Sequence, residues 1–291
     1  MRSLIALVLV FGCSNECFIE GLNCEDQSPG VRFSAVVVGP SQSCTLTVDG
    51  AVACWDSRDP GARLPAGRYT EIALGEAHIC GVTLDGTIAC GGNPNLPQSM
   101  GPGPGANFHG LSAGAHHNCA IAGASSAVCW GSNSEGETTP PTGSIDVVTA
   151  GLTHSCAIRT DGTAVCWGSN LSGEATPPAG RFYAIAASSF YTCGVTDRRA
   201  IVCWGQVLDG QPTEGSFVSI SAGGVSACAI DVAGKPACWG GGLSNPRVPE
   251  GTVFTAISVG NQKACGVTST QRAYCWSQAG EVFIPPAFTQ P

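Results

Sequence analysis

Charge and linear enzyme motifs are both scarce in this sequence. Charged residues make up 12% of the chain and the formal net charge is −8, which disfavours a nucleic-acid partner. The chain contains no serine-elbow motif, no paired-histidine zinc motif and no phosphate-binding loop. These absences favour a non-catalytic protein, although an active site assembled from distant segments would leave no linear trace.

The apolar run at the start of the chain is too short to cross a membrane. Leu4 to Phe11 spans eight residues, whereas a transmembrane helix needs roughly 20. With Arg2 before it, the run predicts a secretory signal peptide over residues 1–12. The stretch that ends in Gly12-Cys13 is similar to a bacterial lipobox, so we expect Cys13 to carry a lipid; ordinary cleavage nearby, which leaves a free thiol, is the alternative. We therefore expect an exported protein, anchored by lipid to the outer membrane of a bacterial cell envelope, with residues 13–30 as a flexible stalk.

Cysteine is abundant, and its count is odd. Of the 17 cysteines, Cys13 is the expected lipid carrier, and Cys17 and Cys24 in the stalk are candidates to pair with each other. An exported chain folds in an oxidising compartment, where closely spaced cysteines form disulfides. The other 14 make seven pairs with nine residues between the two members: Cys44 and Cys54, Cys80 and Cys90, Cys119 and Cys129, Cys156 and Cys166, Cys193 and Cys203, Cys228 and Cys238, and Cys265 and Cys275.

The cysteine pairs mark seven copies of one unit. Successive first cysteines lie 36, 39, 37, 37, 35 and 37 residues apart, and each copy has a block of 23 residues in which the spacing never changes. Eleven residues before the first cysteine stands a large apolar residue, and the second cysteine is followed by tryptophan in every copy except the one with Gly91. The large apolar residues are Phe33, Tyr69, Phe108, Ile145, Phe182, Phe217 and Phe254.

Each block is typical of strand, turn, strand, hairpin turn and strand. Period-2 β-branched and aromatic residues are broken by glycine, and proline-rich connections separate the blocks. In one copy a three-residue loop, 160–162, sets Cys156 opposite Cys166 on neighbouring strands. We therefore expect one disulfide within each hairpin. Four copies have glycine at the last loop position; the turns should differ somewhat in the other three, which have Ser125, Arg199 and Gln271 there.

Metal ligation is the alternative role for the cysteines. Zinc sites usually have gaps of about two to four residues and histidines at matching spacing, and these units repeat neither. We expect no metal and no cofactor.

The repeat predicts an all-β fold in which the units form a ring. Both faces of each hairpin are apolar, so every sheet must be covered by its neighbours on both sides. A single seven-bladed β-propeller over residues 31–291, with about three strands in each blade, meets this requirement. An open solenoid would meet it too, but it needs atypical capping units, and the first and last units here are like the others.

The best-formed unit resembles a known repeat. Ala150-Gly151, His154-Ser155-Cys156-Ala157-Ile158, Asp161-Gly162 and Val165-Cys166-Trp167-Gly168-Ser169-Asn170 together resemble the regulator of chromosome condensation repeat. The short, cysteine-paired form is also similar to the propeller of crinkly-type plant receptors, and repeats of this kind occur in bacterial lipoproteins. The resemblance implies a seven-bladed propeller, and it implies little about function, because members of the family have unrelated roles.

The turns before the first cysteines are the candidate binding segments, because they differ between copies. If they line one mouth of the ring, His116, Phe190, Tyr191 and Lys263 are exposed there and are candidates to contact a partner. Packing between blades is the alternative for these four side chains. For the histidines two residues before a first cysteine, His78, His117 and His154, we expect a structural hydrogen bond.

These observations favour a monomeric protein that binds another protein or an envelope component through its loops, without catalysis. A propeller enzyme with its site at the centre of the ring is one alternative. A purely architectural protein at the cell surface is another.

Overall fold

The computed structural model describes residues 31–285 of the chain, apart from 57–61, 104, 106, 207, 279, 281 and 284. The expected signal peptide, the lipidation site at Cys13 and the stalk with Cys17 and Cys24 lie outside the described residues. Within them the only helix is a short 3-10 turn, Pro97–Ser99, and no described helix is long and apolar enough to span a membrane.

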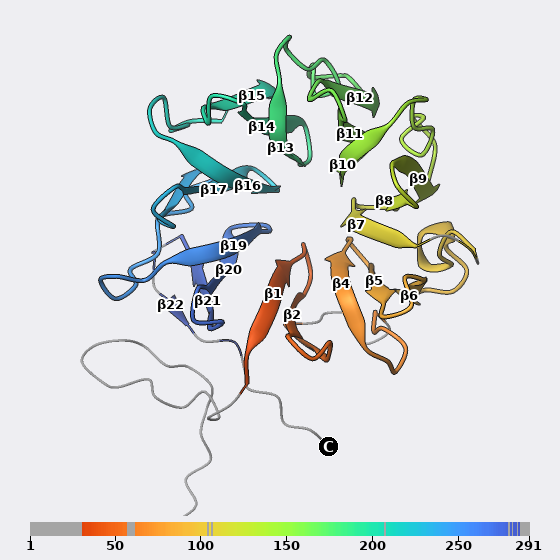
Figure 1. Ribbon diagram of the computed structural model, residues 1–291, viewed down its shortest axis with the longest axis horizontal. Helices are drawn as coiled ribbons and strands as arrows, with labels where there is room; N and C mark the ends of the chain where they lie inside the picture. Colours follow the sequence, from red (N-terminus) through yellow and green to blue (C-terminus); the bar gives the residue numbers. More distant parts are fainter. Residues whose placement is uncertain are drawn as a thin grey trace, which may run out of the picture.

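Seven antiparallel sheets stand around a central axis, as predicted (Figure 1). Six have three strands, and the seventh adds a short fourth strand at its outer edge. The blades, in chain order, are β1 (Phe33–Val38), β2 (Ser43–Thr47) and β3 (Val52–Trp55); β4 (Tyr69–Leu74), β5 (His78–Thr83) and β6 (Ile88–Gly92); β7 (Phe108–Ala113), β8 (His117–Ala122) and β9 (Ser126–Gly131); β10 (Ile145–Ala150), β11 (His154–Arg159) and β12 (Ala164–Gly168); β13 (Phe182–Ala187), β14 (Tyr191–Thr196) and β15 (Ile201–Gly205); β16 (Phe217–Gly223), β17 (Ser226–Asp231) and β18 (Pro236–Gly240); and β19 (Phe254–Val259), β20 (Lys263–Thr268), β21 (Ala273–Ser277) and β22 (Val282–Phe283).

The disulfide prediction is confirmed in all seven blades. Each bridge joins the second strand to the third within one hairpin, with Cα atoms 3.9 to 4.1 Å apart. In the fourth blade Cys156 pairs with Cys166 in the register that the loop length predicts. The loop closes through two backbone hydrogen bonds, from Arg159 N to Thr163 O (2.9 Å) and from Gly162 N to Arg159 O (2.8 Å).

The expectation about the three turns without glycine at the last loop position is wrong for two of them. Arg199 and Gln271 adopt the left-handed conformation themselves, with φ of 64° and 61°, and make the same closing hydrogen bonds as the glycine turns. Only the turn with Ser125 differs, because its left-handed residue is Gly123, at the first loop position. The hairpin register therefore overrides the preference of arginine and glutamine for negative φ.

One backbone hydrogen bond links every blade to the next and closes the ring. The N–H at the start of each first strand donates to the carbonyl of the last loop residue in the preceding blade's hairpin. Phe182 N, for example, donates to Gly162 O at 2.8 Å, and the seventh bond, from Phe33 N to Gln271 O at 2.9 Å, joins the first blade to the last. Because the closing contact has the geometry of the other six, the ring is complete without capping units.

The hydrophobic core lies between the blades. In one cluster Cys119 and Ile121 of the third blade pack against Ile145, Val148 and Ala157 of the fourth. The same positions recur at other seams, where Ile158 meets Phe182, for example. Burying such side chains contributes about 1.5–3 kcal/mol each, so the seams between blades supply most of the stabilising apolar contact.

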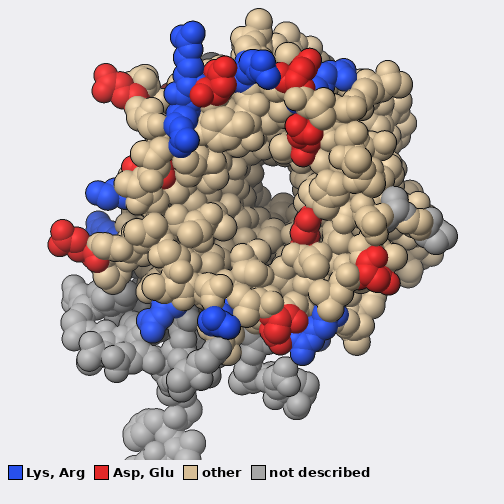
Figure 2. Space-filling view, viewed as in Figure 1, with Lys and Arg blue, Asp and Glu red and all other residues tan. Residues whose placement is uncertain are grey.

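The first strands line a central channel with a volume of about 640 Å³. Its wall is made mostly of small and aliphatic side chains, and Glu76 and Asp146 are the only charged residues in its lining among those the structure describes. Figure 2 shows the opening, with the Lys and Arg side chains kept to the outer edge of the ring.

The ring has two faces, which we name by their turns. The turn face carries the connections between the first and second strands of each blade, residues 39–42, 75–77, 114–116, 151–153, 188–190, 224–225 and 260–262. The hairpin face carries the loops between the second and third strands.

Candidate functional site

Hydrogen bonds between adjacent blades make the turn face a rigid platform. Glu76 N donates to Ala115 O at 3.2 Å, Ala115 N to Gly151 O at 3.2 Å, and Leu152 N to Ser188 O at 3.0 Å. Neighbouring turns are therefore fixed relative to one another. Side chains that project from them hold set positions around the mouth of the channel.

Glycine is needed where these turns approach each other. A Cβ atom on Gly151 would lie 2.4 Å from Ser188 O and 2.6 Å from Cε1 of His154, and one on Gly114 would lie 2.2 Å from Gly151 O. Such distances are far below van der Waals contact, so these glycines serve close packing of backbones.

The three recurring histidines make the structural hydrogen bonds that the sequence predicts. Each is buried and reaches from its own blade to the next. At 2.8 Å in every case, Nε2 of His78 meets Oδ1 of Asn118, Nε2 of His117 meets Oγ of Ser155, and Nε2 of His154 meets Oγ1 of Thr192. We call these three pairs the histidine ladder.

The partners of the ladder fix the protonation of its histidines. Ser155 Oγ donates to Glu137 O at 3.0 Å and Thr192 Oγ1 to Glu174 O at 3.1 Å, so each hydroxyl accepts from the histidine Nε2–H. Nδ1 of all three imidazoles is buried without a hydrogen-bond partner. Burial lowers the pKa of His78, and it lowers the pKa of both His117 and His154 to about 4. The ladder is therefore neutral at pH 7.

Two buried carboxylates support the ladder from the connecting loops. Glu137 and Glu174 are 1% and 0% exposed. Burial alone would raise the pKa of Glu174, but backbone N–H groups, including that of Ser172 at 2.6 Å, and the Ser169 hydroxyl donate to its carboxylate and lower the pKa below its usual value. Hydrogen bonds to the backbone likewise outweigh burial at Glu137 and lower its pKa. Both residues order loops and have no exposed acid group to offer.

Two of the four predicted contact residues are exposed on the turn face. His116 Nε2 lies 3.3 Å from Oε2 of Glu76, and both side chains are about half exposed. Phe190 is 40% exposed. Both stand three residues before a first cysteine.

The prediction that Tyr191 is exposed is wrong. The side chain is 1% exposed, and its hydroxyl donates to Ser226 O of the next blade at 2.6 Å. Burial raises the pKa of this phenol. Tyr191 takes the place that the histidines occupy in other blades, and it packs between two blades instead of facing solvent.

Lys263 is only partly exposed and belongs to the seam between the seventh blade and the first. Its Nζ forms an ion pair with Asp56 and lies 5.4 Å from the ring centroid of Trp55 and 5.2 Å from that of Phe283. These contacts reach from the last blade to the first and support the packing alternative for Lys263.

Two exposed apolar residues on this face were missed by the sequence analysis. Val225 is 46% exposed, and Leu171 is 89% exposed in the loop after β12, which a hydrogen bond from Ser169 N to Thr153 O at 2.9 Å ties to this face. Val225 lies on the turn next to that of Phe190, because Ser188 Oγ donates to Gly224 O at 3.0 Å. The missed signal is positional: Val225, like His116 and Phe190, stands three residues before a first cysteine.

No group of three or more metal-ligating side chains is placed to hold an ion within the described part of the chain.

The exposed side chains of the turn face form two groups. Leu171, Phe190 and Val225 make up an apolar arc, and Glu76 and His116 make up a polar arc.

Comparison with known proteins identifies the repeat and the fold. Residues 145–174 match the model of the regulator of chromosome condensation (RCC1) repeat. The ectodomain of the receptor kinase CR4 from Physcomitrella patens is similar in structure, with a TM-score of 0.70 and 27% identity over 85% of this chain and 74% of that one. The CRINKLY ectodomain of the Arabidopsis thaliana receptor kinase ACR4 gives 0.68 and 24% over 85% and 98%.

Prp20p from Saccharomyces cerevisiae shares the fold at lower identity. Its TM-score is 0.65, with 14% identity over 78% of this chain and 80% of that one. No curated protein sequence matches the chain.

Proposed function

Because this chain is a seven-bladed propeller of RCC1-type repeats, we propose that it binds another protein through its turn face, as a monomer and without catalysis. The observation that carries the proposal is the apolar arc of Leu171, Phe190 and Val225, which are 89%, 40% and 46% exposed. Aromatic side chains are enriched at protein interfaces, and exposed apolar side chains that gather on one face of a folded protein are typical of an interaction site.

Other propellers with this fold support a protein partner. Prp20p has described binding properties toward Gsp1p and histones, and yeast RCC1 (Prp20) forms a complex with Kap60. We carry over only the class of partner, since their low identity to this chain makes the particular partners uninformative.

A binding role also agrees with the chemistry of the buried groups. The histidine ladder is buried and neutral, and its Nε2–H groups are used in hydrogen bonds between blades. These imidazoles have no path to exchange a proton with a substrate, so they do not supply a general acid or base.

The proposed location is the cell envelope. Seven disulfides indicate an extracellular or exported protein, and two similar structures are receptor ectodomains. We propose that a lipid on Cys13 anchors the chain to the outer membrane of a bacterium. Mass spectrometry of the purified chain tests this anchor, because an unmodified N-terminal segment would contradict it.

Affinity capture from an envelope extract tests the binding proposal. We expect the wild-type chain to retain one protein in stoichiometric amount, and the double variant Phe190→Ser and Val225→Ser to lose it. Leu84→Ser is the matched control, because Leu84 is 68% exposed on the hairpin face. Equal capture by the double variant would contradict the turn-face site, and capture of nothing by the wild type would favour an architectural role.

A further inference from the structure

The hairpin face carries three neighbouring arginines near the fifth blade. Arg198 and Arg199 form the tip of the β14–β15 hairpin, and Arg181 precedes β13. The backbone ties them together, because Asp197 N donates to Arg181 O at 2.9 Å. All three are exposed. In Figure 2 the basic side chains gather most densely at the upper edge, over β10 to β15, with acidic side chains between them.

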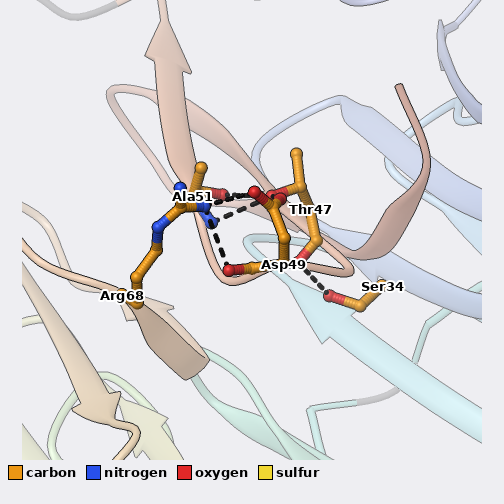
Figure 3. Close-up of polar contacts among 5 residues, drawn as sticks. All are labelled: Ser34, Thr47, Asp49, Ala51 and Arg68. Carbon is orange, nitrogen blue, oxygen red and sulfur yellow. Dashed lines mark hydrogen bonds and ion pairs between the residues drawn. The ribbon is translucent and has the colours of Figure 1, made fainter. Parts of the chain in front are cut away.

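Arg181 lacks the ion pair that the equivalent arginine forms at another place in the ring. Arg68, twelve residues before Cys80, forms an ion pair with Asp49 at the tip of the preceding hairpin and donates to Asp49 O at 3.0 Å (Figure 3). Arg181 and Asp161 hold the same two positions in the fifth and fourth blades.

Between the fourth and fifth blades, Asp161 forms its hydrogen bonds within its own hairpin. The Asp161 carboxylate accepts from Thr163 N and Oγ1 at 2.9 and 2.6 Å. Neither Arg181, Arg198 nor Arg199 forms an ion pair with any other residue that the structure describes. The charge of Arg181 still lowers the pKa of the Asp161 carboxyl, but none of the three guanidinium groups is held in an ion pair, so their N–H donors can bind an external anion.

The fold does not require arginine at the tip of this hairpin. Arg199 has φ of 64°, a conformation that disfavours any residue with a Cβ atom, and four other blades have glycine at the same position. Tyr183, 39% exposed at the start of β13, lies on the same face. An unpaired arginine cluster beside an exposed tyrosine has the composition of a recognition surface.

The chain enters the described part of the ring on this same face. Arg32 O accepts a hydrogen bond from Val48 N at the tip of the first hairpin, and Phe33 N donates to the tip of the last one. Figure 1 places β1 and β13 on opposite sides of the ring. The point where the chain enters the ring, beside β1, and the arginines near β13 therefore lie at two separated places on the same face.

We propose that the hairpin face lies against a membrane, with Arg181, Arg198 and Arg199 bound to the headgroups of anionic phospholipids. The orientation rests on the N-terminal anchor proposed above. Guanidinium groups bind phosphate through paired hydrogen bonds, and tyrosine is favoured at the level of the headgroups. Asp161 and Asp197 lie among the arginines and weaken the attraction, so the surface acts together with the anchor.

A ring that lies flat in this way points its turn face away from the membrane. The apolar arc of Leu171, Phe190 and Val225 is then presented to proteins in the adjoining compartment. Lipid binding and partner binding use opposite faces and do not compete.

Vesicle sedimentation tests the proposal on the exported full chain with Cys13→Ser, which removes the lipid and leaves the face intact. The probes are vesicles of phosphatidylcholine alone and of phosphatidylcholine mixed with phosphatidylglycerol. We expect partitioning onto the mixed vesicles only, and its loss at high salt. The variant Arg181→Ser, Arg198→Ser, Arg199→Gly should partition about 100-fold more weakly, since each basic residue near an anionic surface contributes about fivefold.

Arg68→Ser is the matched control, because Arg68 lies on the same face but is already paired with Asp49; we expect partitioning close to wild type. Equal binding to both vesicle types, or an unchanged triple variant, would overturn the proposal. Binding to dextran sulfate without binding to vesicles would also overturn it, since the surface would then recognise a soluble polyanion. If mass spectrometry finds no lipid on Cys13, the proposed anchor is contradicted, but the vesicle assay still tests lipid binding by the arginines. Affinity capture by the turn face is a separate measurement.

Discussion

At the residue scale, the histidine ladder couples protonation to folding. His117 and His154 are buried and lack an acceptor for a proton on Nδ1, so the folded state favours the neutral ring. In the unfolded chain the pKa of histidine is about 6.5, whereas in the folded protein the pKa of each is lowered to about 4. The unfolded state therefore binds more protons between these two values.

We expect the free energy of unfolding to fall as the pH drops from 7 to 5. Because the pKa of His117 and of His154 is about 4 in the folded protein and about 6.5 in the unfolded chain, each histidine lowers the free energy of unfolding by about 2 kcal/mol between pH 7 and 5. Chemical denaturation at several pH values measures it. His154→Gln should show a smaller pH dependence than the wild type, and a free energy of unfolding that does not vary between pH 7 and 5 would contradict the coupling.

Adding one methyl group at the base of the turn face should destabilise the ring. In Gly151→Ala the new Cβ would lie 2.4 Å from Ser188 O, so two blades must separate, and we expect a loss of about 2 kcal/mol or more. Thermal unfolding measures the change. Gly67→Ala is the control, because the nearest atom to its Cβ would be 3.6 Å away; equal losses in the two variants would contradict the close-approach argument.

The residue scale is also where the sequence analysis was least accurate. A structural role is predicted correctly for His78, His117 and His154, whereas the prediction that Tyr191 and Lys263, at the same position in other copies, are exposed does not hold. Side chains two residues before a first cysteine point toward the next blade, while several of those three residues before it point to solvent. Reading the copies position by position would have excluded Tyr191 and selected Val225.

At the scale of the element, each disulfide clamps one hairpin. The loop it closes is only about 11 residues, so the chain-entropy estimate for one bridge is about 3 kcal/mol. We expect Cys156→Ala with Cys166→Ala to lower the free energy of unfolding by up to about this amount while the ring remains folded. Denaturation with circular dichroism measures the loss, and failure of the whole chain to fold would contradict the independence of the blades.

In the hairpin loops, the length of the loop determines the strand register, whereas the residue at the last loop position does not determine the turn conformation. The nine-residue spacing predicts the register correctly in every blade, but the identity of the last loop residue does not predict the turn. Arginine and glutamine are held in the left-handed region because the strands and the closing bonds on either side fix the loop.

Arg199→Gly should therefore stabilise the protein by up to about 1 kcal/mol, whereas Gly162→Ala, at the same position in the neighbouring blade, should destabilise it by a similar amount. Denaturant midpoints of the two variants measure the pair. Changes of the same sign would show that conformation at this position does not control stability.

At the scale of the whole molecule, the seam between the seventh blade and the first is the one where Lys263 replaces a histidine. Lys263→Met removes the ion pair with Asp56 and the contacts with two aromatic rings. We expect hydrogen exchange in β1 and β21 to become roughly tenfold faster, since such contacts contribute about 1–2 kcal/mol together. Lys235→Met is the control, because Lys235 is exposed. A uniform increase in all blades would contradict a local seam.

The ring itself was predictable because the constraint is global and repeated. Seven equal units with two apolar faces must cover each other, and the units at both ends look alike, so closure follows from the sequence. The arginine cluster and the apolar arc were not predictable in this way. They depend on which positions of neighbouring blades meet on one face, and that follows from the inter-blade hydrogen bonds.

The confinement of every disulfide to a single blade has a consequence for how such a surface evolves. Each covalent clamp holds its own hairpin and leaves the exposed turn beside it free of cross-links to other units. A substitution in one turn then leaves the covalent frame of the other six untouched. New specificity can be acquired one blade at a time, which suits this ring to diversification of its ligands.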